Sequence, residues 1–379
     1  MPSSPDHHYV PRPSLLERWA SRFLQRYNDL DRFSSRERSA KERIALRRVH
    51  KQAIIYAGLA GIVSGGLIGG GEVYMRQGLL DGMQDMSLWE QAPYWLVFSV
   101  VAGLISLVEI LFLYWNALRA IGTISRLAGV PLQPSGHARV VNRSLARAAL
   151  EFPSPRQHIY GIDPFAYVST WKLSLQAVLY RMKVGVSSFL LRVVLRRVLG
   201  RAALRGLVPL ITGPLYAVWN GVITRKMLKE AHEAALGPFA IHTLVEQLES
   251  ARETLGKRSQ EIVLQGVGEI VMQNAQAHPN HVLLLYHLLE AFGRDDDEIQ
   301  AEWTQHTARL GTLGGAEKSL VLHVLDMACV MAGPLNRRKR TFLKQVHAMC
   351  DAQYDVTRLK AMRSKMLAGQ RIEVGEGWG

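Results

Sequence analysis

AIIYAGLAGIVSGGLIGGG, residues 53–71, is the most informative stretch of this 379-residue chain. Its nineteen residues carry no charge, and seven of them are glycine. The core of a water-soluble domain does not need an uninterrupted apolar run of this length. A bilayer does, because about 20 apolar residues at ~1.5 Å each span its hydrocarbon. The stretch therefore predicts a membrane-spanning helix over about residues 53–72.

A second apolar run covers residues 92–115 and carries a Tyr-Trp pair near each end. The pairs are Tyr94 with Trp95, and Tyr114 with Trp115. A helix between them covers about 31 Å, which matches the interval between the aromatic belts of two membrane interfaces. The two runs together predict a transmembrane helical hairpin over residues 39–119.

Basic residues flank the outer sides of this hairpin, and its connection is acidic. Arg47 and Arg48 precede the first span, and Arg119 follows the second. The connection, residues 74–91, holds three acidic residues and one arginine. Since positive segments stay on the cytoplasmic side, the pattern predicts a cytoplasmic N-terminus, an outside loop and a return to the cytoplasm.

The net charge of +14 is concentrated near the apolar runs. Residues 171–205 hold eight Lys and Arg and no Asp or Glu, whereas residues 234–379 hold sixteen against seventeen. Basic residues beside apolar runs are typical of contact with anionic lipid. A nucleic-acid-binding protein would instead carry its basic residues along one face of a soluble domain, which is not the pattern here. We therefore expect anionic lipid and no nucleic acid as a partner. The expected lipid-binding residues are Arg192, Arg196, Arg197, Arg201 and Arg205.

Residues 1–38 combine a polar, proline-rich start with a basic amphipathic helix. The start is expected to be disordered, and Ser14 with Glu17 then forms the S-x-x-E capping box that begins a helix. Its apolar face comprises Leu15, Leu16, Trp19, Phe23, Tyr27 and Leu30. Such a face suits either a membrane surface or another helix of the protein, which periodicity alone does not distinguish. Ser39 and Glu42 repeat the capping box before the first span.

Residues 166–233 predict a second, basic helical hairpin. A long helix over 166–199 is followed by another uncharged run, 206–224. If both helices crossed the bilayer, their arginine-rich connection would lie outside, against the positive-inside bias. We therefore expect this hairpin in the inner leaflet or packed on the first two spans. Four complete spans are the alternative.

The rest of the chain predicts a soluble part made of helices. Residues 120–165 form a cytoplasmic connection, and residues 234–379 form a bundle of about six helices, the last over Val356–Ala368. Pro238 and Pro279 stand where first-turn prolines belong, and Gly333 follows the end of an apolar-periodic run. The predicted fold class is all-α throughout.

Two segments resemble known families. Residues 196–231 combine an arginine-rich lead, a small-residue apolar run and Asn220 before a basic exit, and this resembles the hairpin of the bacterial EcsC-like families. Residues 320–369 resemble a unit of the tellurite-resistance B (TerB)-like helical domain, in which an apolar helix ends at Gly333 and Pro334-Leu335-Asn336 starts the next helix. Residues 283–302 look like a first copy of that unit.

The TerB-like resemblance implies a compact, stress-associated helical module that is often joined to membrane segments. Family members commonly carry an Asp before the turn glycine and a Glu in the following helix, which can bind metal. This chain has Ala332 and Lys339 or Arg340 at those positions, which argues against a metal there. The first copy keeps weak candidate metal ligands, namely Asp295, Asp297 and Glu298.

Two features of the predicted spans could be functional. Glycines recur every four residues in the first span: Gly61, Gly65 and Gly69 on one face, and Gly66 and Gly70 on another. Such faces let helices approach closely in lipid, here toward the second span or another protomer. Glu109 is the only charge in the second span, where a carboxylate is costly. It is a proton or cation site, a partner of Arg181 or Lys183, or a carboxylate that reaches the interface.

The remaining titratable residues do not form a recognisable catalytic set. The histidines at 278, 281 and 287 lack the spacing of a metal pair, because Pro279 interrupts them. Residues His323, Cys329, His347 and Cys350 could meet across two helices, as core and capping residues or, less favourably, as zinc ligands. The two cysteines are expected to be free thiols in a reducing cytosol. No cofactor is expected.

The sequence therefore predicts a non-enzymatic, membrane-anchored scaffold or stress-response module. It would sit as a multi-pass protein in the bacterial inner membrane, with both termini cytoplasmic, and recruit a cytoplasmic protein partner through its C-terminal domain. Formation of a homo-oligomer is compatible with the glycine face. The alternative is a small oligomeric channel or transporter that uses the glycine-rich first span and Glu109.

Overall fold

The computed structural model describes residues 13–28, 30, 33–75, 87–132, 136–152, 158–169, 171, 208–274, 276–294, 299 and 303–374. Within these ranges every regular element is an α-helix, and the one β-bridge joins Ile159 to Ile162. The predicted all-α class is therefore confirmed for the described residues. The chain divides into two compact units. Unit 1 comprises Met1–Leu46, Ile121–Ser169 and Lys229–Gly379, and unit 2 comprises Arg47–Ala120 and Thr170–Leu228.

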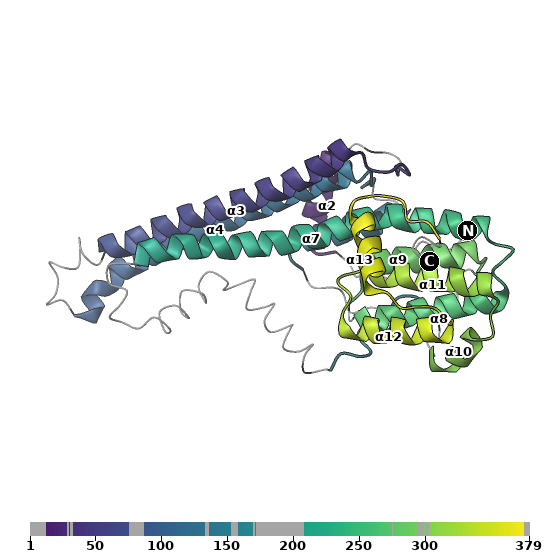
Figure 1. The fold of residues 1–379 in the computed structure, drawn as a ribbon. Helices are drawn as coiled ribbons and strands as arrows, with labels where there is room; N and C mark the ends of the chain where they lie inside the picture. The colour runs from purple at the N-terminus through teal and green to yellow at the C-terminus, as the bar shows by residue number, and fades with distance from the viewer. Residues whose placement is uncertain are drawn as a thin grey trace. The chain divides into compact units, whose positions relative to one another are not determined.

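In the part of unit 2 that the structure describes, three long helices lie side by side (Figure 1). They are α3 (Ala40–Tyr74), α4 (Leu88–Leu127) and α7 (Val208–Ser250). The first two are long and apolar enough to cross a membrane, as the sequence predicted. Their helical ends extend beyond the predicted spans, because the basic residues flanking each apolar run continue the same helix.

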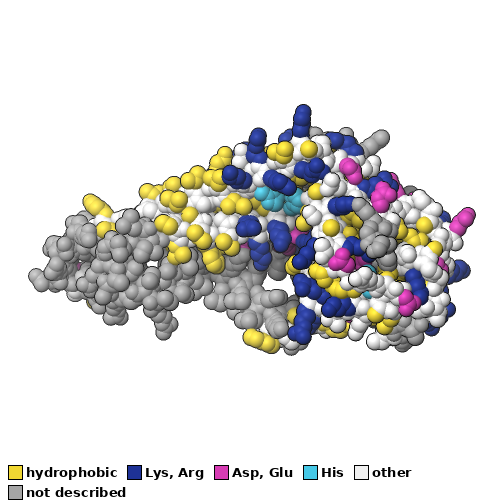
Figure 2. All heavy atoms as spheres, viewed as in Figure 1, with side chains coloured by type: hydrophobic (Ala, Val, Ile, Leu, Met, Phe, Trp, Pro, Cys, Tyr) yellow, Lys and Arg dark blue, Asp and Glu magenta, His cyan; other side chains and the backbone are white. Residues whose placement is uncertain are grey.

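Apolar side chains on these helices face outward. Only 11% of the most apolar window of α4 is buried inside the protein. Figure 2 shows yellow, apolar side chains spread along the helices of unit 2. Exposed examples are Leu59, Val63 and Leu67 on α3, Leu96, Val100, Leu104, Leu107 and Leu111 on α4, and Val218 and Val222 on α7. Water does not favour a surface of this kind, so an apolar environment around the helices is the one that stabilises it.

The predicted capping boxes are both present. Ser14 Oγ accepts a hydrogen bond from the Glu17 amide at 3.2 Å, and Glu17 accepts one from the Ser14 amide at 2.7 Å. These bonds begin α2 (Leu15–Tyr27). The Ser39 amide likewise donates to Glu42 at 2.7 Å, immediately before α3. Local sequence was sufficient here because both partners belong to the same helical turn.

Helix α2 packs on α5 (Gly136–Ala149) with a different face from the predicted apolar one. It buries Ala20, Leu24 and Glu17, and Glu17 pairs with Arg147 of α5. Leu15, Leu16 and Trp19, which head the predicted apolar face, are exposed. The part of the face formed by these three residues is therefore free to contact something other than α5, whereas Tyr27 lies against Gly122 of α4.

The C-terminal part of unit 1 is a helical bundle arranged around α11 (Gly315–Met331). Helix α11 contacts α8 (Lys257–Asn274), α9 (Pro279–Ala291), α12 (Arg337–Met349) and α13 (Val356–Leu367). Helix α10 (Trp303–Leu310) packs on α8 and α12. All residues of α11 from Leu320 to Met331 are buried, as expected of a helix that is apolar on every side.

Several predicted boundaries of this bundle are confirmed. Pro279 occupies the first turn of α9, and α13 ends one residue before the predicted position. The same prediction for Pro238 is wrong, because Pro238 lies within the continuous helix α7. Gly333 follows α11 with a φ of 71°, a left-handed conformation that favours glycine.

Some predicted features lie outside the described residues. They include most of the basic hairpin before Val208, all five arginines expected to bind lipid (Arg192, Arg196, Arg197, Arg201 and Arg205), and the three weak metal candidates Asp295, Asp297 and Glu298. The predicted start of that hairpin is wrong, because residues 166–169 form turns and irregular backbone, not a helix.

Candidate functional site

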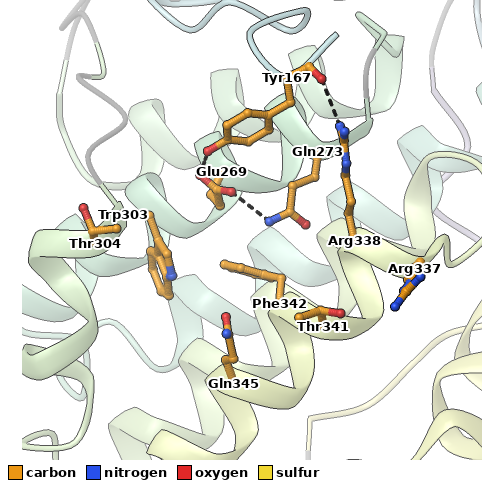
Figure 3. Close-up of a pocket in the computed structure, with 10 residues that line it drawn as sticks. All are labelled: Tyr167, Glu269, Gln273, Trp303, Thr304, Arg337, Arg338, Thr341, Phe342 and Gln345. Carbon is orange, nitrogen blue, oxygen red and sulfur yellow. Dashed lines mark hydrogen bonds between the residues drawn. The ribbon is translucent and has the colours of Figure 1, made fainter. Parts of the chain in front are cut away.

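An open cleft of about 1080 Å³ lies in unit 1, between α8, α10 and α12 (Figure 3). Its residues come from four separate segments of the chain. Tyr167 belongs to the loop after α5, Glu269 and Gln273 to α8, Trp303 and Thr304 to the start of α10, and Arg337, Arg338, Thr341, Phe342 and Gln345 to α12. The bundle around α11 fixes the three helices, so the cleft is part of a packed framework.

A chain of hydrogen bonds forms one wall of the cleft. The Tyr167 hydroxyl donates to Glu269 Oε2 at 3.0 Å, and Gln273 Nε2 donates to Glu269 Oε1 at 2.8 Å. Burial, together with the neighbouring Glu269 charge, raises the pKa of Tyr167, so the phenol keeps its proton and remains a donor. Glu269 thus has a donor on each carboxylate oxygen.

The orientation of the Gln273 amide follows from this chain. A carboxylate only accepts hydrogen bonds, so the amide nitrogen must face Glu269 and the amide oxygen must face away from it. Figure 3 shows that oxygen turned toward the α12 side of the cleft. It is buried, and it has no hydrogen-bond partner in the described structure. An unsatisfied buried acceptor costs about 1–3 kcal/mol, so Gln273 provides a place for a hydrogen-bond donor.

Two arginines form the rim of the cleft on the first turn of α12. Arg338 donates to the Tyr167 carbonyl oxygen at 3.2 Å, and its guanidinium lies 5.9 Å from the centre of the Tyr167 ring. Arg337 is exposed, and neither arginine forms an ion pair with a described carboxylate. The first turn of a helix favours anions, so two cations there are electrostatically unfavourable until an anion neutralises them.

Trp303 and Phe342 form an apolar wall. Their ring centres lie 5.1 Å apart, and both side chains are more than nine-tenths buried. Sequence reasoning missed this cleft. The detectable signal was the run Arg337-Arg338-Lys339-Arg340, which opens a helix without any acidic residue.

Lys339, in the same run, points into the bundle. Its ammonium donates to the carbonyl oxygens of Cys329 and Ala332 at the end of α11, and its side chain is fully buried. Burial lowers the pKa of Lys339 from 10.5 to about 8. The side chain supplies a positive charge to the carbonyls of the turn.

A second buried charge lies beside the same turn. Glu233 of α7 pairs with Arg363 of α13, and it accepts a hydrogen bond from the Gly333 amide at 3.0 Å. Arg363 also donates to the Val330 carbonyl oxygen. The turn after α11 is thus fixed by two cationic side chains and one carboxylate, all inside unit 1.

In unit 2, Glu109 pairs with a residue of α7. Asn220 Nδ2 donates to Glu109 Oε1 at 2.7 Å, and the two residues are 8% and 7% exposed. Glu109 Oε2 is buried and has no hydrogen-bond partner in the described structure. Nearby, Asn116 Nδ2 donates to the Ala53 carbonyl oxygen at 2.9 Å and so joins α4 to α3. Arg181 and Lys183, the partners considered from sequence, lie outside the described residues.

The predicted glycine faces have different environments. A Cβ at Gly61 would lie 2.6 Å from the Tyr216 carbonyl carbon, so this glycine allows α3 and α7 to approach closely. Gly65 and Gly69 are buried. A Cβ at Gly66 or Gly70 would meet no described atom within 4 Å. The partner of Gly61 is therefore α7, which was neither of the two partners considered from sequence.

Most of the histidines and cysteines singled out from the sequence are buried among backbone groups and side chains of the bundle. His278 caps α9 by accepting from the Asn280 amide, His281 contacts the Ala328 carbonyl oxygen at 2.9 Å, and His347 lies 3.0 Å from Asp326. Both cysteines are free and buried. Burial raises their thiol pKa values to about 12 for Cys329 and about 11 for Cys350. Among the described residues, no group of three or more His, Cys, Asp or Glu is placed to hold a metal ion.

No protein-family model, curated protein or solved structure matches this chain. The EcsC-like and TerB-like resemblances therefore stay predictions that rest on the residues quoted for them.

Proposed function

We propose that this protein is a non-enzymatic scaffold that is anchored in the bacterial inner membrane and holds a cytoplasmic protein partner on unit 1. The outward apolar surface of α4 is the observation that carries the proposal. From Leu96 to Leu111 its large apolar side chains point away from the protein, and lipid is the surrounding that accepts them. A TerB-like module in this setting is associated with stress responses, and that association is part of the proposal.

Helix α2 supports a second contact with lipid. Leu15, Leu16 and Trp19 are exposed, and Arg18 and Arg22 on the same helix are exposed as well. Apolar anchors next to cations are typical of a helix that lies in the interface of an anionic membrane. The arginines between 192 and 205 would add to this attraction.

The recruiting role is assigned to unit 1 because its cleft carries polar and charged groups that are not fully satisfied. The buried Gln273 amide oxygen has no hydrogen-bond donor in the described structure, and the exposed Arg337 and Arg338 have no described counter-charge. Buried polar groups in native proteins are normally satisfied, so the Gln273 oxygen favours a binding surface over a purely structural one.

Membrane anchoring is tested by washing membranes with alkaline carbonate and by labelling single introduced cysteines. Cys329 and Cys350 are buried with raised thiol pKa values, so an introduced thiol is the only reactive one. We expect Ser87→Cys to react with an impermeant maleimide from outside the cell and Gln345→Cys to react only in inverted vesicles. Release of the protein by carbonate, or labelling of both sites from the same side, would overturn the anchored scaffold.

Recruitment is tested with a photo-crosslinking amino acid at exposed positions of unit 1. A cytoplasmic protein covalently joined at Thr341 or Gln345, and not at Leu104 of α4, is the expected result. Absence of any adduct from positions distributed over the whole exposed surface of unit 1 would contradict a recruiting role.

A small oligomeric channel or transporter is the second candidate, and Glu109 favours it. Its Oε2 is buried without a partner inside a bundle of apolar helices, where polar groups often mark an ion or proton pathway. Proton or cation flux in liposomes that disappears with Glu109→Gln would support this candidate. Equal flux in empty and protein-containing liposomes would contradict it.

A further inference from the structure

We propose that the cleft between α8, α10 and α12 binds an acidic segment of the partner protein, in which glutamate or aspartate alternates with apolar residues. This inference rests on the proposed scaffold function and specifies its partner. Three sets of groups support it: the arginines of the rim, the apolar wall and the unsatisfied amide oxygen of Gln273.

The two arginines of the rim favour the binding of an anion. Arg337 and Arg338 open α12 together with Arg340, and α12 contains no acidic residue that could neutralise them. Among the described residues, Glu269 is the one carboxylate that lines the cleft, and its two oxygens already accept from Tyr167 and Gln273. An arriving carboxylate therefore meets unneutralised guanidinium groups, which bind carboxylates with charge-assisted and often bidentate hydrogen bonds.

The apolar wall and the amide oxygen of Gln273 favour a peptide as the bound anion. Trp303 and Phe342 line the cleft with the small part of their rings that stays exposed, and an aliphatic side chain of the segment would pack against that part. The Gln273 oxygen needs an N–H or O–H donor, and every peptide residue except proline offers a main-chain N–H. That oxygen is closed to water in the described structure, so a neighbouring side chain must move before a donor of the segment reaches it.

Size and ring exposure argue against a nucleotide. The cleft volume of about 1080 Å³ is at the upper limit of small-molecule pockets, which hold about 300–1,000 Å³. A base would need a free aromatic face for stacking. Trp303 and Phe342 are more than nine-tenths buried against each other and do not provide one.

The binding experiment uses the full-length protein in nanodiscs of zwitterionic lipid, so that anionic lipid does not compete. The probe is a fluorescein-labelled peptide in which glutamate alternates with leucine, followed by fluorescence anisotropy. Its matched control has glutamine in place of glutamate. We expect saturable binding of the acidic peptide, weakened by salt, and at least about tenfold weaker binding of the glutamine peptide.

Matched variants locate the binding site. Arg337→Gln with Arg338→Gln removes two cations that line the cleft. Arg340→Gln with Lys344→Gln removes two cations of the same helix that do not line it. We expect about tenfold loss of affinity for the first pair and less than about twofold for the second. Gln273→Met should weaken binding several-fold without changing its salt dependence. Circular dichroism during heating verifies that each variant is folded.

Three other outcomes would contradict the proposal that the cleft binds an acidic segment. Equal losses of affinity in the two double variants indicate nonspecific attraction to α12. Equal binding of the acidic and glutamine peptides removes the preference for an acidic segment. Displacement by inorganic phosphate or ATP at concentrations that matched chloride does not reproduce indicates a small-anion site. In all three cases the scaffold proposal survives if crosslinks to unit 1 persist, so the two failures are distinguishable.

Discussion

The ammonium nitrogen of Lys339 lies 3.2 Å from the carbonyl oxygen of Cys329, at the point where α11 ends. The last carbonyls of a helix lack partners within it and carry the negative end of the helix dipole. Lys339 satisfies them from the following helix and so fixes the angle at which α12 leaves the turn. The same turn places Arg337 and Arg338 at the cleft, so the inward-facing lysine positions the outward-facing arginines.

The first prediction concerns pH. Burial lowers the pKa of Lys339 to about 8 in the folded protein, against 10.5 in the unfolded chain. Below pH 8 both states hold the proton, and folding bears the full penalty of burying the charge. Between the two pKa values the unfolded chain binds more protons, so the free energy of unfolding rises with pH. A neutral amine still donates two hydrogen bonds, so both carbonyls stay satisfied.

The measurement compares the wild-type protein with Lys339→Met by chemical denaturation from pH 7 to pH 10.5. Other groups titrate equally in both proteins and cancel in the difference. We expect the wild type to gain roughly 3 kcal/mol relative to the variant across this range. A constant difference, or one that falls with rising pH, would show that Lys339 is not held in a desolvated site.

The second prediction concerns the buried pair Glu233–Arg363. Arg363→Met leaves the Glu233 carboxylate buried without its counter-charge, so we expect a loss of about 3–5 kcal/mol in unfolding free energy. The matched control is Arg371→Met, because Arg371 lies 3.6 Å from Glu246 and both side chains are nearly half exposed. Its expected loss is at most about 1 kcal/mol. Similar losses in the two variants would contradict the contribution assigned to burial.

The sequence predicted those features whose cause is local. Both capping boxes were found because their partners lie three residues apart, and the two long apolar helices were found because length and hydropathy are properties of one segment. The cleft was not predicted, because it joins four segments and periodicity does not show which helix faces which. For the same reason, the sequence did not predict that α7 is the helix that packs against Gly61.

The burial of Lys339 and Glu17 was not predicted. The sequence analysis considered Lys339 only as a departure from the metal-binding position of the TerB-like unit, and Glu17 only as part of a capping box. Both are buried and paired with groups of another helix. Lys339 did carry a detectable signal. The buried positions of this region recur at helical spacing: Leu335, Lys339, Phe342, Leu343 and Val346. A charge on that stripe indicates an internal partner, since an unpaired buried charge is too costly to persist.

The third prediction compares two glycines of α3. A Cβ at Gly61 would overlap the backbone of Tyr216, whereas a Cβ at Gly66 meets nothing within 4 Å. We expect Gly61→Ala to destabilise the packing of α3 on α7 by about 1–3 kcal/mol and Gly66→Ala to be neutral or slightly stabilising. Thermal unfolding in nanodiscs measures both. An equal effect at the two positions would mean that the close α3–α7 approach does not exist in the membrane.

The fourth prediction concerns Glu109 and Asn220. Glu109→Gln keeps a carbonyl oxygen for the Asn220 amide, so we expect its stability to stay within about 0.5 kcal/mol of the wild type. Glu109→Leu removes the acceptor and should cost about 1 kcal/mol, which is typical of hydrogen bonds between membrane helices. A double-mutant cycle with Asn220→Leu, measured by thermal unfolding in nanodiscs, isolates the pair, with an expected coupling of about 1 kcal/mol.

If the coupling is absent, the contact between Glu109 and Asn220 does not stabilise the bundle. If it is present and Glu109→Gln also leaves ion flux unchanged, the carboxylate joins α4 to α7 and has no role in transport.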